Sequence, residues 1–348
     1  MPNKQLIIGL PAGSLANPGR GGNLIQLLEN AGFATSGYET GGPSRFSTIN
    51  YLFGWDGRPQ EFGSQLGVNE LDVAIAGDDW IKERTIEFRL EYETEIHLEK
   101  ALSLKRGNVN IVGIASGADA TNAEKFFRHL CQIRKLITIV AEMPYLALDW
   151  VQQVLKRINK FENFSEFRVQ KYKTPPQIDS GILIYETWGK TEAKVKNGGA
   201  DAGIEITQSG VAIKNYGLTV IDSIMESETG IWINPQLKID NEKSDLLKMF
   251  LLNLYGVVNA ENKVMILFNA PNETVPEIEN YLSANNLFAD EPTKNVGKHF
   301  TEFSIQVDTR NRDIPLARVR YELARRKAVN IDTIPIRSSI QSLDVLGF

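Results

Sequence analysis

The sequence is poor in the residue types that form covalent cross-links and protein-held metal sites. It has one cysteine, Cys131, and three histidines, His97, His129 and His299, among 348 residues. A lone cysteine excludes an intrachain disulfide and a cysteine-rich metal centre, and it fits a reducing compartment such as the cytoplasm. The histidines form no i, i+4 pair, so no zinc motif is indicated. We expect Cys131 to be a small buried residue and the histidines to be structural or exposed.

Long apolar runs and a strong net charge are also lacking. No window approaches the roughly 18 apolar residues of a membrane-spanning helix, and the start of the chain lacks the pattern of a secretory signal. The formal net charge of -5 is mild and spread along the chain, so it gives no footprint for nucleic acid or anionic lipid. The alternating charges from Glu83 to Lys100 are expected to form a solvated surface, with an edge ribbon as one arrangement. We therefore expect a cytoplasmic protein with neither a membrane nor a nucleic-acid partner.

The composition is that of a folded chain with more than one core. Hydrophobic residues make up 42% and charged residues 23% of the sequence, which excludes general disorder and allows two or three cores. Apolar runs predict strands at 6–10, 73–76, 109–115 and 136–141, and helical periodicity predicts helices at 23–31, 122–135 and 144–158. Strands that alternate with helices indicate an α/β fold with a largely parallel sheet.

A weak internal echo divides this part into two lobes. ELDVAIAG at 70–77 and GADAGIE at 199–205 share the order of a small or apolar residue, Asp, a short buried strand, a polar turn and a helix. Two similar α/β lobes with a cleft between them, as in type II periplasmic binding proteins, are the natural interpretation. We predict lobe I over 1–105, with the chain returning to it at about 211–238, and lobe II over 106–210.

The pattern changes after Asn234-Pro235. Helices predicted at 243–254, 275–282 and 316–326 alternate with strands predicted at 263–268, 301–307 and 331–336. This βαβαβ order predicts a compact α+β domain, ferredoxin-like or ACT-like, with its helices on one face. We place this domain at 242–348, after a linker at 235–241.

The stretch GIEITQSGVAI at 203–213 passes from strand-like alternation into a helical pattern, with small polar groups at the junction. Unpaired N–H groups and the dipole at a helix start favour an anion, and glycine lets the backbone approach a ligand closely. Thr207, Gln208 and Ser209 can donate to phosphate, whereas Glu205 suits ribose hydroxyls. The stretch therefore suits a phosphoribosyl group. A plain N-cap is the commoner role of Ser or Thr at such a position, and both interpretations stay open here.

Further motifs occur in a fixed order along the chain. They are LPAGSL at 10–15, RPQE at 58–61, DVAIAGDDW at 72–80, GKTE at 189–192, GADAGIEITQSG at 199–210, KNYGL at 214–218, KVMILFNAP at 263–271, PT at 292–293 and NIDTIPI at 330–336. In this order they resemble the long form of the ATP phosphoribosyltransferase family, the first enzyme of histidine biosynthesis. The resemblance covers nearly the whole chain.

The resemblance implies an enzyme that binds ATP and 5-phosphoribosyl 1-diphosphate between its lobes, with Mg²⁺ as cofactor. N1 of adenine then displaces pyrophosphate from the anomeric carbon of the ribose. Charge builds on the leaving group and on the ribose, so cations, N–H dipoles and carboxylates are the groups that the site needs. Because N1 is itself the nucleophile, no strong protein base is required. The resemblance also implies a C-terminal regulatory domain that binds histidine as an allosteric inhibitor, and assembly into dimers or hexamers.

The same resemblance assigns roles to residues. Arg58 and Glu205 are the expected catalytic residues, because a guanidinium binds oxyanions in a bidentate manner and a carboxylate accepts hydrogen bonds from ribose hydroxyls. The phosphoribosyl donor is expected to contact Glu192, Glu205, Thr207, Gln208, Ser209, Gly210, Val211 and Ala212. The nucleotide is expected to contact Pro11, Gly13, Arg20, Arg58, Asp78 and Asp79. No residue is assigned as a metal ligand, although Asp78 and Asp79 could hold Mg²⁺ through water.

Several of these assignments have a structural alternative. Arg58 could be a solvated or salt-bridged side chain. Asp78 and Asp79 could cap the helix that carries Trp80, which is expected in the core rather than as an adenine platform. Glu192 could be an exposed helical residue.

The chain departs from the family pattern in two loops. The first loop of the family usually reads Pro-Lys-Gly-Arg-Leu, whereas Ala12 and Ser14 stand here at the two cationic positions. An inserted NPGRGG at 17–22 carries Arg20, which could replace a missing cation or could lie in a flexible turn. In the donor loop, Ala212 stands where the family has Thr, so one phosphate hydroxyl is lost. A lost hydrogen bond to a charged group costs about 1.5–3 kcal/mol.

Three functions therefore stay open. The first is a working ATP phosphoribosyltransferase. The second, suggested by Ala12, Ser14 and Ala212, is a degenerate homologue that binds a nucleotide, a phosphoribosyl ligand or an amino acid as a sensor or regulatory subunit. The third is an enzyme of the same fold that uses another acceptor base.

Overall fold

The computed structural model describes residues 4–12, 23–38, 44–47, 49–117, 121–287 and 293–347. The sequence predictions for Gly13, Ser14, Leu15, Arg20, the 17–22 loop and Pro292 lie outside the described residues. The chain divides into two compact units, of which the first is Met1–Gln26 with Phe33–Met249 and the second is Leu27–Gly32 with Phe250–Phe348. Within the described ranges, no helix is long and apolar enough to cross a membrane.

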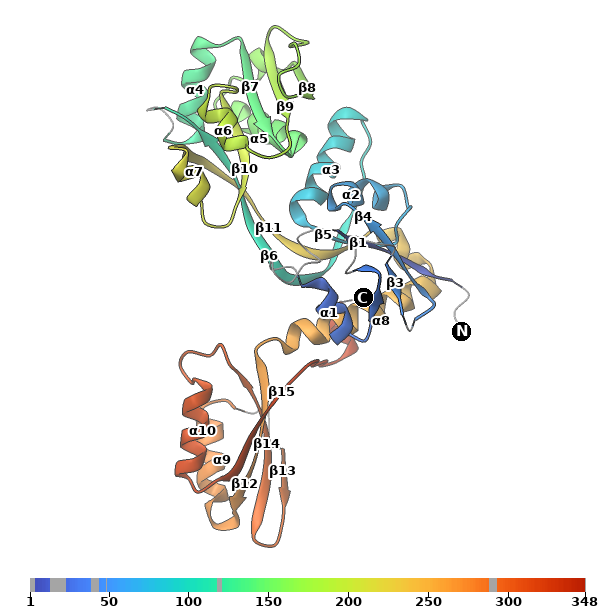
Figure 1. The fold of residues 1–348 in the computed structure, drawn as a ribbon, viewed down its shortest axis with the longest axis vertical. Helices are drawn as coiled ribbons and strands as arrows, with labels where there is room; N and C mark the ends of the chain where they lie inside the picture. The colour runs from blue at the N-terminus through green and yellow to red at the C-terminus, as the bar shows by residue number, and fades with distance from the viewer. Residues whose placement is uncertain are drawn as a thin grey trace. The chain divides into compact units, whose positions relative to one another are not determined.

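The first unit is built on a nine-stranded sheet (Figure 1). Its order is β4 (Leu52–Gly57), β1 (Leu6–Pro11), β5 (Val73–Gly77), β11 (Thr219–Ile233), β6 (Glu99–Ala115), β10 (Ala202–Thr207), β7 (Leu136–Ala141), β9 (Gly181–Glu186) and β8 (Phe167–Lys171). β4, β1 and β5 are parallel, and so are β10, β7, β9 and β8. β6 and β11 are antiparallel to each other and to β10 and β5. The parallel arrangement is confirmed within each group, whereas the two long antiparallel strands were not predicted.

The two groups of parallel strands define two lobes, which confirms the predicted α/β class with a pair of lobes. Lobe I consists of β4, β1 and β5 with α2 (Pro59–Gly67) and α3 (Asp78–Glu91). Lobe II consists of β10, β7, β9 and β8 with α4 (Ala123–Ile133), α5 (Pro144–Arg157), α6 (Thr191–Lys196) and α7 (Val211–Asn215). β6 and β11 run through both lobes, because one end of their pairing lies beside β5 and the other beside β10. A separate pair joins β2 (Thr35–Ser36) to β3 (Arg45–Phe46).

The core of lobe II illustrates why its helices pack where they do. α4 begins after Asn122, whose side chain accepts a hydrogen bond from the Lys125 N–H, and it buries Phe126, Phe127 and Leu130 as their spacing predicts. The Phe127 ring meets the Trp150 ring of α5 edge to face, with centroids 5.5 Å apart. Trp150 also donates from Nε1 to Asp222 Oδ2 of β11 at 2.9 Å. The apolar faces of α4 and α5 are thereby fixed against the long strands.

The second unit contains a four-stranded antiparallel sheet of order β13-β14-β12-β15. The elements are β12 (Lys263–Pro271), α9 (Val275–Ala284), β13 (Thr293–Val296), β14 (Phe300–Asp308), α10 (Leu316–Arg325) and β15 (Val329–Pro335). α9 and α10 cover one face of the sheet (Figure 1). This βαββαβ order is ferredoxin-like, so the predicted class is confirmed, although β13 was not predicted. Helices α1 (Leu24–Asn30) and α8 (Asn241–Ala260) each contribute residues to both units, and short 3-10 helices lie at Phe161–Phe164, Pro235–Ile239, Asn272–Thr274 and Leu343–Leu346.

The prediction of a solvated surface from Glu83 to Lys100 is wrong at its start. Residues up to Glu91 belong to α3, and only 1% of Glu83 is exposed. The sequence could not indicate this burial, because the groups that compensate it are the backbone N–H groups of Tyr145 and Leu146. At the other end of the stretch, Lys100 is the second residue of β6. It therefore belongs to the nine-stranded sheet rather than to a separate ribbon.

Candidate active site

Three parallel strands of lobe I end at one edge of the sheet, where residues predicted to bind the nucleotide follow. β1 ends at Pro11, β4 at Gly57 and β5 at Gly77, and open α/β sheets bind ligands at the carboxyl ends of their strands. Arg58 is the exposed N-cap residue of α2, and its side chain makes no capping hydrogen bond. Pro11 is buried, and its carbonyl accepts a hydrogen bond from the Tyr38 hydroxyl at 2.6 Å. This edge therefore presents the Arg58 guanidinium to solvent, whereas Pro11 is engaged with Tyr38.

Asp78 and Asp79 begin α3 but meet different partners. Oδ1 of Asp79 accepts a hydrogen bond from the Trp80 N–H at 2.9 Å, and the Asp79 N–H donates to Ser227 Oγ at 3.1 Å. Asp79 is 5% exposed, and burial raises the pKa of its carboxyl. Asp78 instead lies with Oδ1 2.9 Å from the Nζ of Lys100 on β6. Asp79 thus accepts a hydrogen bond within the first turn of its own helix, whereas Asp78 faces a cavity between the lobes.

Lobe II presents a second edge, formed by the ends of β10, β7 and β9. These strands are parallel and are followed by residues 207–211, by Glu142 and by residues 187–191. The carboxyl ends of neighbouring parallel strands meet at one edge, so three segments that are distant in the sequence lie together. The predicted donor loop is one of these segments, and the predicted GKTE motif at 189–192 overlaps another. Glu142 was missed as their neighbour.

Three carboxylates interact at the lobe II edge. Burial, followed by the negative charges of Glu192 and Glu142, raises the pKa of Glu205 to about 7. Oε1 of Glu205 accepts a hydrogen bond from the Ile206 N–H at 3.2 Å. Glu192 and Glu205, both predicted from the sequence, are therefore brought together. Glu142 had a usable signal, because it follows a buried strand in the same way that Asp78 follows β5.

The donor loop itself is open. Gly210 has a left-handed φ of 68°, and a Cβ added there would meet no described atom within 4 Å. The Gly210 N–H donates to Thr207 Oγ1 at 2.8 Å. α7 has only five residues. The loop therefore offers exposed hydrogen-bond donor groups to a ligand rather than the dipole of a long helix. Four residues of the loop and the first turn are exposed: Gln208, Ser209, Val211 and Ala212.

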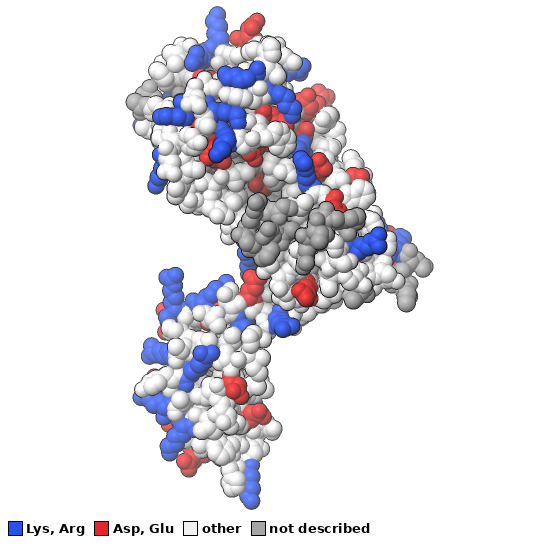
Figure 2. All heavy atoms as spheres, in the orientation of Figure 1, with Lys and Arg blue, Asp and Glu red and all other residues white. Residues whose placement is uncertain are grey.

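Basic side chains also stand at the lobe II edge. Lys190 is exposed and precedes α6 with a φ of 59°, and Lys194 Nζ donates to the Gly189 carbonyl at 2.5 Å. On the face drawn in Figure 2, Lys and Arg side chains are interspersed with Asp and Glu side chains over lobe II. The turn after β9 and the start of α6 therefore carry cationic side chains, whereas Ala12 supplies none in lobe I.

A cavity of about 520 Å³ lies where the lobes are joined. It is lined by Asp78, Asn108, Val109, Asn110, Gln208, Glu226, Ser227 and Glu228. Its wall combines Asp78 of lobe I and Gln208 of lobe II with residues of the β6 and β11 strands. Two predicted site residues thus meet in one cavity, whereas Arg58, Glu192 and Glu205 are not among its lining residues. Asn108 and Asn110 were missed, because no sequence pattern distinguishes a strand that passes through two lobes.

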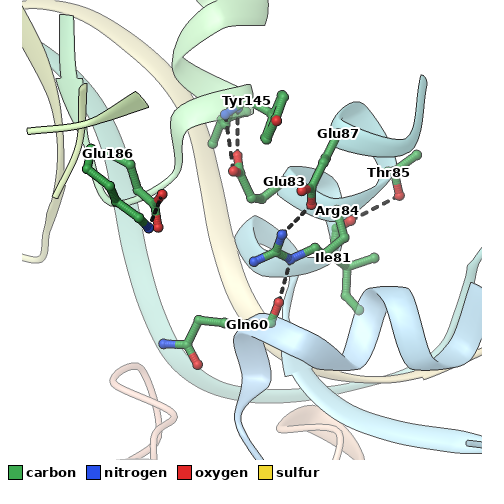
Figure 3. Close-up of polar contacts among 10 residues, drawn as sticks. Gln60, Ile81, Glu83, Arg84, Thr85, Glu87, Tyr145 and Glu186 are labelled. Atoms are coloured by element: carbon green, nitrogen blue, oxygen red, sulfur yellow. Dashed lines mark hydrogen bonds and ion pairs between the residues drawn. The ribbon is translucent and has the colours of Figure 1, made fainter. Parts of the chain in front are cut away.

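Arg84 connects α3 to the segment that carries Arg58. Its Nε donates to the Gln60 carbonyl at 2.6 Å, in the first turn of α2 (Figure 3). Arg84 also pairs with Glu87 on its own helix. α3 therefore holds Asp78 at its first residue and supports the start of α2 from its second turn.

Sequence comparisons match this chain to one known family. A family model described as ATP phosphoribosyltransferase matches residues 58–254. An ATP phosphoribosyltransferase of Solidesulfovibrio magneticus is 36% identical over 278 residues, which cover 79% of this chain and 80% of that relative. The chain belongs to the ATP phosphoribosyltransferase family. Another ATP phosphoribosyltransferase, from Chlorobium luteolum, is 25% identical over 284 residues that cover 81% of each chain.

Solved structures give more distant similarities. An ATP phosphoribosyl transferase (HisG:HisZ) complex from Thermotoga maritima is 15% identical with a TM-score of 0.49, covering 72% of this chain and 98% of that chain. The arginine-bound form of ArgBP from the same organism is 14% identical with a TM-score of 0.34, covering 72% and 94%. The predicted family and its class of activity are confirmed by the sequence relatives alone. That class is a pentosyltransferase at the first step of histidine biosynthesis.

Proposed function

We propose that the chain joins ATP to 5-phosphoribosyl 1-diphosphate, with N1 of adenine displacing diphosphate from the anomeric carbon. The observation that carries the proposal is the cavity that Asp78 of lobe I and Gln208 of lobe II line together. Two substrates react efficiently only when their reacting atoms are held about 3–3.5 Å apart. A cavity with one wall from each lobe suits that requirement, because each lobe can hold one substrate.

The donor binds at the lobe II edge in this proposal. Glu192 and Glu205 accept hydrogen bonds from the ribose hydroxyls, and Gln208 and Ser209 donate to the phosphate. The backbone from Gly210 to Ala212 approaches the phosphate closely, because Gly210 leaves open space where a side chain would stand. Thr207 Oγ1 accepts from the Gly210 N–H, which leaves its own hydroxyl hydrogen available for the ligand.

The nucleotide binds at the lobe I edge. Arg58 is exposed there and can form paired hydrogen bonds with phosphate oxygens. The attacking atom is N1 of adenine, so the proposed site contains no protein base. As the bond to diphosphate breaks, positive charge develops on the ribose, and the Glu205 carboxylate stabilises that charge.

Mg²⁺ is the proposed cofactor. Among the described residues, no group of three or more His, Cys, Asp or Glu side chains is arranged to hold a metal by itself. Mg²⁺ in enzymes of phosphate chemistry is usually held by one or two carboxylates together with substrate phosphates. Two of the carboxylates at the lobe II edge, Glu142 and Glu205, would fit that arrangement together with substrate phosphates. When bound, the metal neutralises charge on the leaving diphosphate.

The second unit is proposed to be the regulatory domain, with histidine as its inhibitor and a homodimer or homohexamer as the assembly. Its separate core around Phe268 and Phe303 supports an independent role. The domain limits of 1–105, 106–210 and 242–348 and the cytoplasmic location remain predictions from the sequence.

The test follows pyrophosphate release by the full-length chain with Mg²⁺, ATP and 5-phosphoribosyl 1-diphosphate. We expect turnover in the wild type and a loss of about a hundredfold or more in Arg58→Ala and in Glu205→Ala. Arg312→Ala and Glu70→Ala are matched controls at exposed positions with no assigned role, and they should keep wild-type turnover.

The same assay distinguishes the alternatives. Ala12 and Ala212 favour a second candidate, a homologue that binds these ligands without catalysis. Tight binding of ATP or the donor in calorimetry with no pyrophosphate release would support that candidate. Release only with another nucleobase compound would support a different acceptor. Repeating the assay with added histidine tests the regulatory role of the second unit.

A further inference from the structure

Glu83 is an ionisable residue with almost no access to solvent. Its exposed fraction is 1%, and it lies in the second turn of α3 in lobe I. A buried carboxylate is tolerated only where hydrogen bonds or charges compensate its lost hydration. The identity of its partners therefore tells what the residue does.

The partners of Glu83 lie in lobe II. Oε1 accepts a hydrogen bond from the Tyr145 N–H at 3.1 Å, and Oε2 accepts one from the Leu146 N–H at 2.6 Å (Figure 3). These are the first N–H groups of α5, because the helix starts at Pro144, which has none. A helix start has unpaired N–H groups and a partial positive charge that a carboxylate satisfies well. One side chain of lobe I thus caps a 14-residue helix of lobe II.

Both ends of this contact lead to residues of the site. On the lobe II side, Glu142 stands just before α5, and its charge acts on Glu205. On the lobe I side, α3 starts at Asp78 in the wall of the cavity. The residue next to Glu83, Arg84, supports the α2 start that carries Arg58.

We infer that Glu83 is a positioning residue for the transfer reaction. Glu83 couples the two lobes, because its hydrogen bonds hold the start of α5, and with it Glu142, beside Glu205. The inference rests on the proposed function of the site. Glu83 is almost fully buried and both of its oxygens are bonded to the start of α5, so it is assigned no contact with the substrates. Its side chain fixes the position of the lobe II edge, where the donor binds, relative to the lobe I edge, where the nucleotide binds.

A second contact between the same helices provides a matched control. Arg89 of α3 lies with Nη2 2.8 Å from Asp149 Oδ1 of α5, and half of the Arg89 side chain is exposed. An exposed ion pair contributes little to stability, and this one does not reach the start of α5. Arg89→Ala therefore removes a link between the lobes without releasing the cap.

The decisive variant is Glu83→Gln in the full-length chain. Glutamine keeps the shape but offers one oxygen and an NH₂ group to two N–H donors, so one of them loses its acceptor. We expect the Kd of 5-phosphoribosyl 1-diphosphate, measured by calorimetry, to rise about five- to tenfold, with a lower kcat. Amide hydrogen exchange of residues 145–147 should become faster. Arg89→Ala should stay within about twofold of the wild type in all three measurements.

A double-mutant cycle with Glu142→Gln separates positioning from general loss of stability. If Glu83 acts through Glu142, adding Glu83→Gln to Glu142→Gln should raise the donor Kd little further. If Glu83→Gln does not fold, Glu83→Asp takes its place, because aspartate keeps the charge but has a shorter reach.

Two results would overturn the inference while leaving the transferase function intact. One is an unchanged donor Kd and kcat in Glu83→Gln, and the other is additive effects of the two variants on Kd. A wild-type chain that fails to bind the donor would remove the proposed function and this inference together.

Discussion

Lys100 on β6 and Glu228 on β11 face each other where the lobes join, with Nζ 2.6 Å from Oε1. The same ammonium group lies 2.9 Å from Asp78 Oδ1, so one cation holds two carboxylates of the cavity wall. Burial alone would raise the pKa of Glu228, but the hydrogen bond from Lys100 offsets it, and the pKa is lowered overall. The wall that would face a phosphorylated substrate is thereby partly neutralised before any ligand binds.

This relationship predicts coupled effects on stability. Lys100→Met should lower the free energy of unfolding by about 1–2 kcal/mol, because Asp78 and Glu228 lose their shared partner. In the double variant with Glu228→Gln, the loss should be smaller than the sum of the two single losses. Urea unfolding measures both quantities. Lys238→Met is the control, because its pair with Glu99 is more exposed and should contribute about 0–1 kcal/mol; strictly additive losses at 100 and 228 would contradict the prediction.

Stability should fall as pH rises from about 4.5 to about 7. The pKa values of Glu83 and Glu205 are raised from 4.5 to about 7 in the folded chain, chiefly by burial. Within this window the folded chain keeps protons that the unfolded chain has released, so the free energy of unfolding decreases with rising pH. For Glu83, the change is at most about 3 kcal/mol.

Urea unfolding across this pH range checks the slope. Glu83→Gln should flatten it, since glutamine does not titrate, whereas exposed Glu95→Gln should leave it unchanged. A slope that is the same in Glu83→Gln and in the wild type would show that Glu83 does not titrate in this window.

Donor binding should improve when the missing hydroxyl is restored. Ala212 is exposed in the first turn of α7, two residues after Gly210, so a threonine hydroxyl there could donate to the donor phosphate. A hydrogen bond to a charged group contributes about 1.5–3 kcal/mol, so KM for the donor should fall about tenfold or more in Ala212→Thr. Ala212→Val adds a side chain of similar size without the hydroxyl. Equal KM values for the two variants would mean that no phosphate contact forms at this position.

The second unit should lose its regulatory response when its core is opened. Phe268 and Phe303 stack with ring centroids 5.1 Å apart and are both buried. Phe303→Ala should cost about 3–5 kcal/mol and reduce inhibition by histidine more than it reduces uninhibited turnover. Phe300→Ala, at a 45% exposed position of the same strand, is the control. Turnover with and without histidine, together with thermal unfolding, tests this; a full histidine response in an unfolded second unit would rule out the regulatory role.

Short buried strands and the polar residues after them were the most predictable part of the molecule. The strand predicted at 73–76 is Val73–Gly77 in the structure, and the helix predicted at 144–158 is Pro144–Arg157. The pattern of such an element lies within the element itself, because the whole strand is buried or one helix face is apolar. The polar junction between such a strand and a helix led to the donor loop, and the resemblance to the ATP phosphoribosyltransferase family led to Asp78.

Longer-range features were not predictable in the same way. The 17 residues of β6 pass from partly exposed near Glu99 to fully buried near Ala115. No single alternation of apolar and polar residues therefore describes the whole strand. The partners of Glu83 are backbone N–H groups 62 and 63 residues away, and backbone groups leave no signature in a sequence. The meeting of Glu142 with Glu205 depends on strand order, which one sequence does not encode in a local pattern.

The order in which the chain passes through the lobes also constrains its synthesis. Val73–Gly77 pairs along one side with Thr229–Ile233, so that side of β5 has no native partner until the ribosome has made all of lobe II. During this interval a buried strand has a free edge, which is a common starting point for misfolding and aggregation. The lobe that is translated first is therefore the last to be completed.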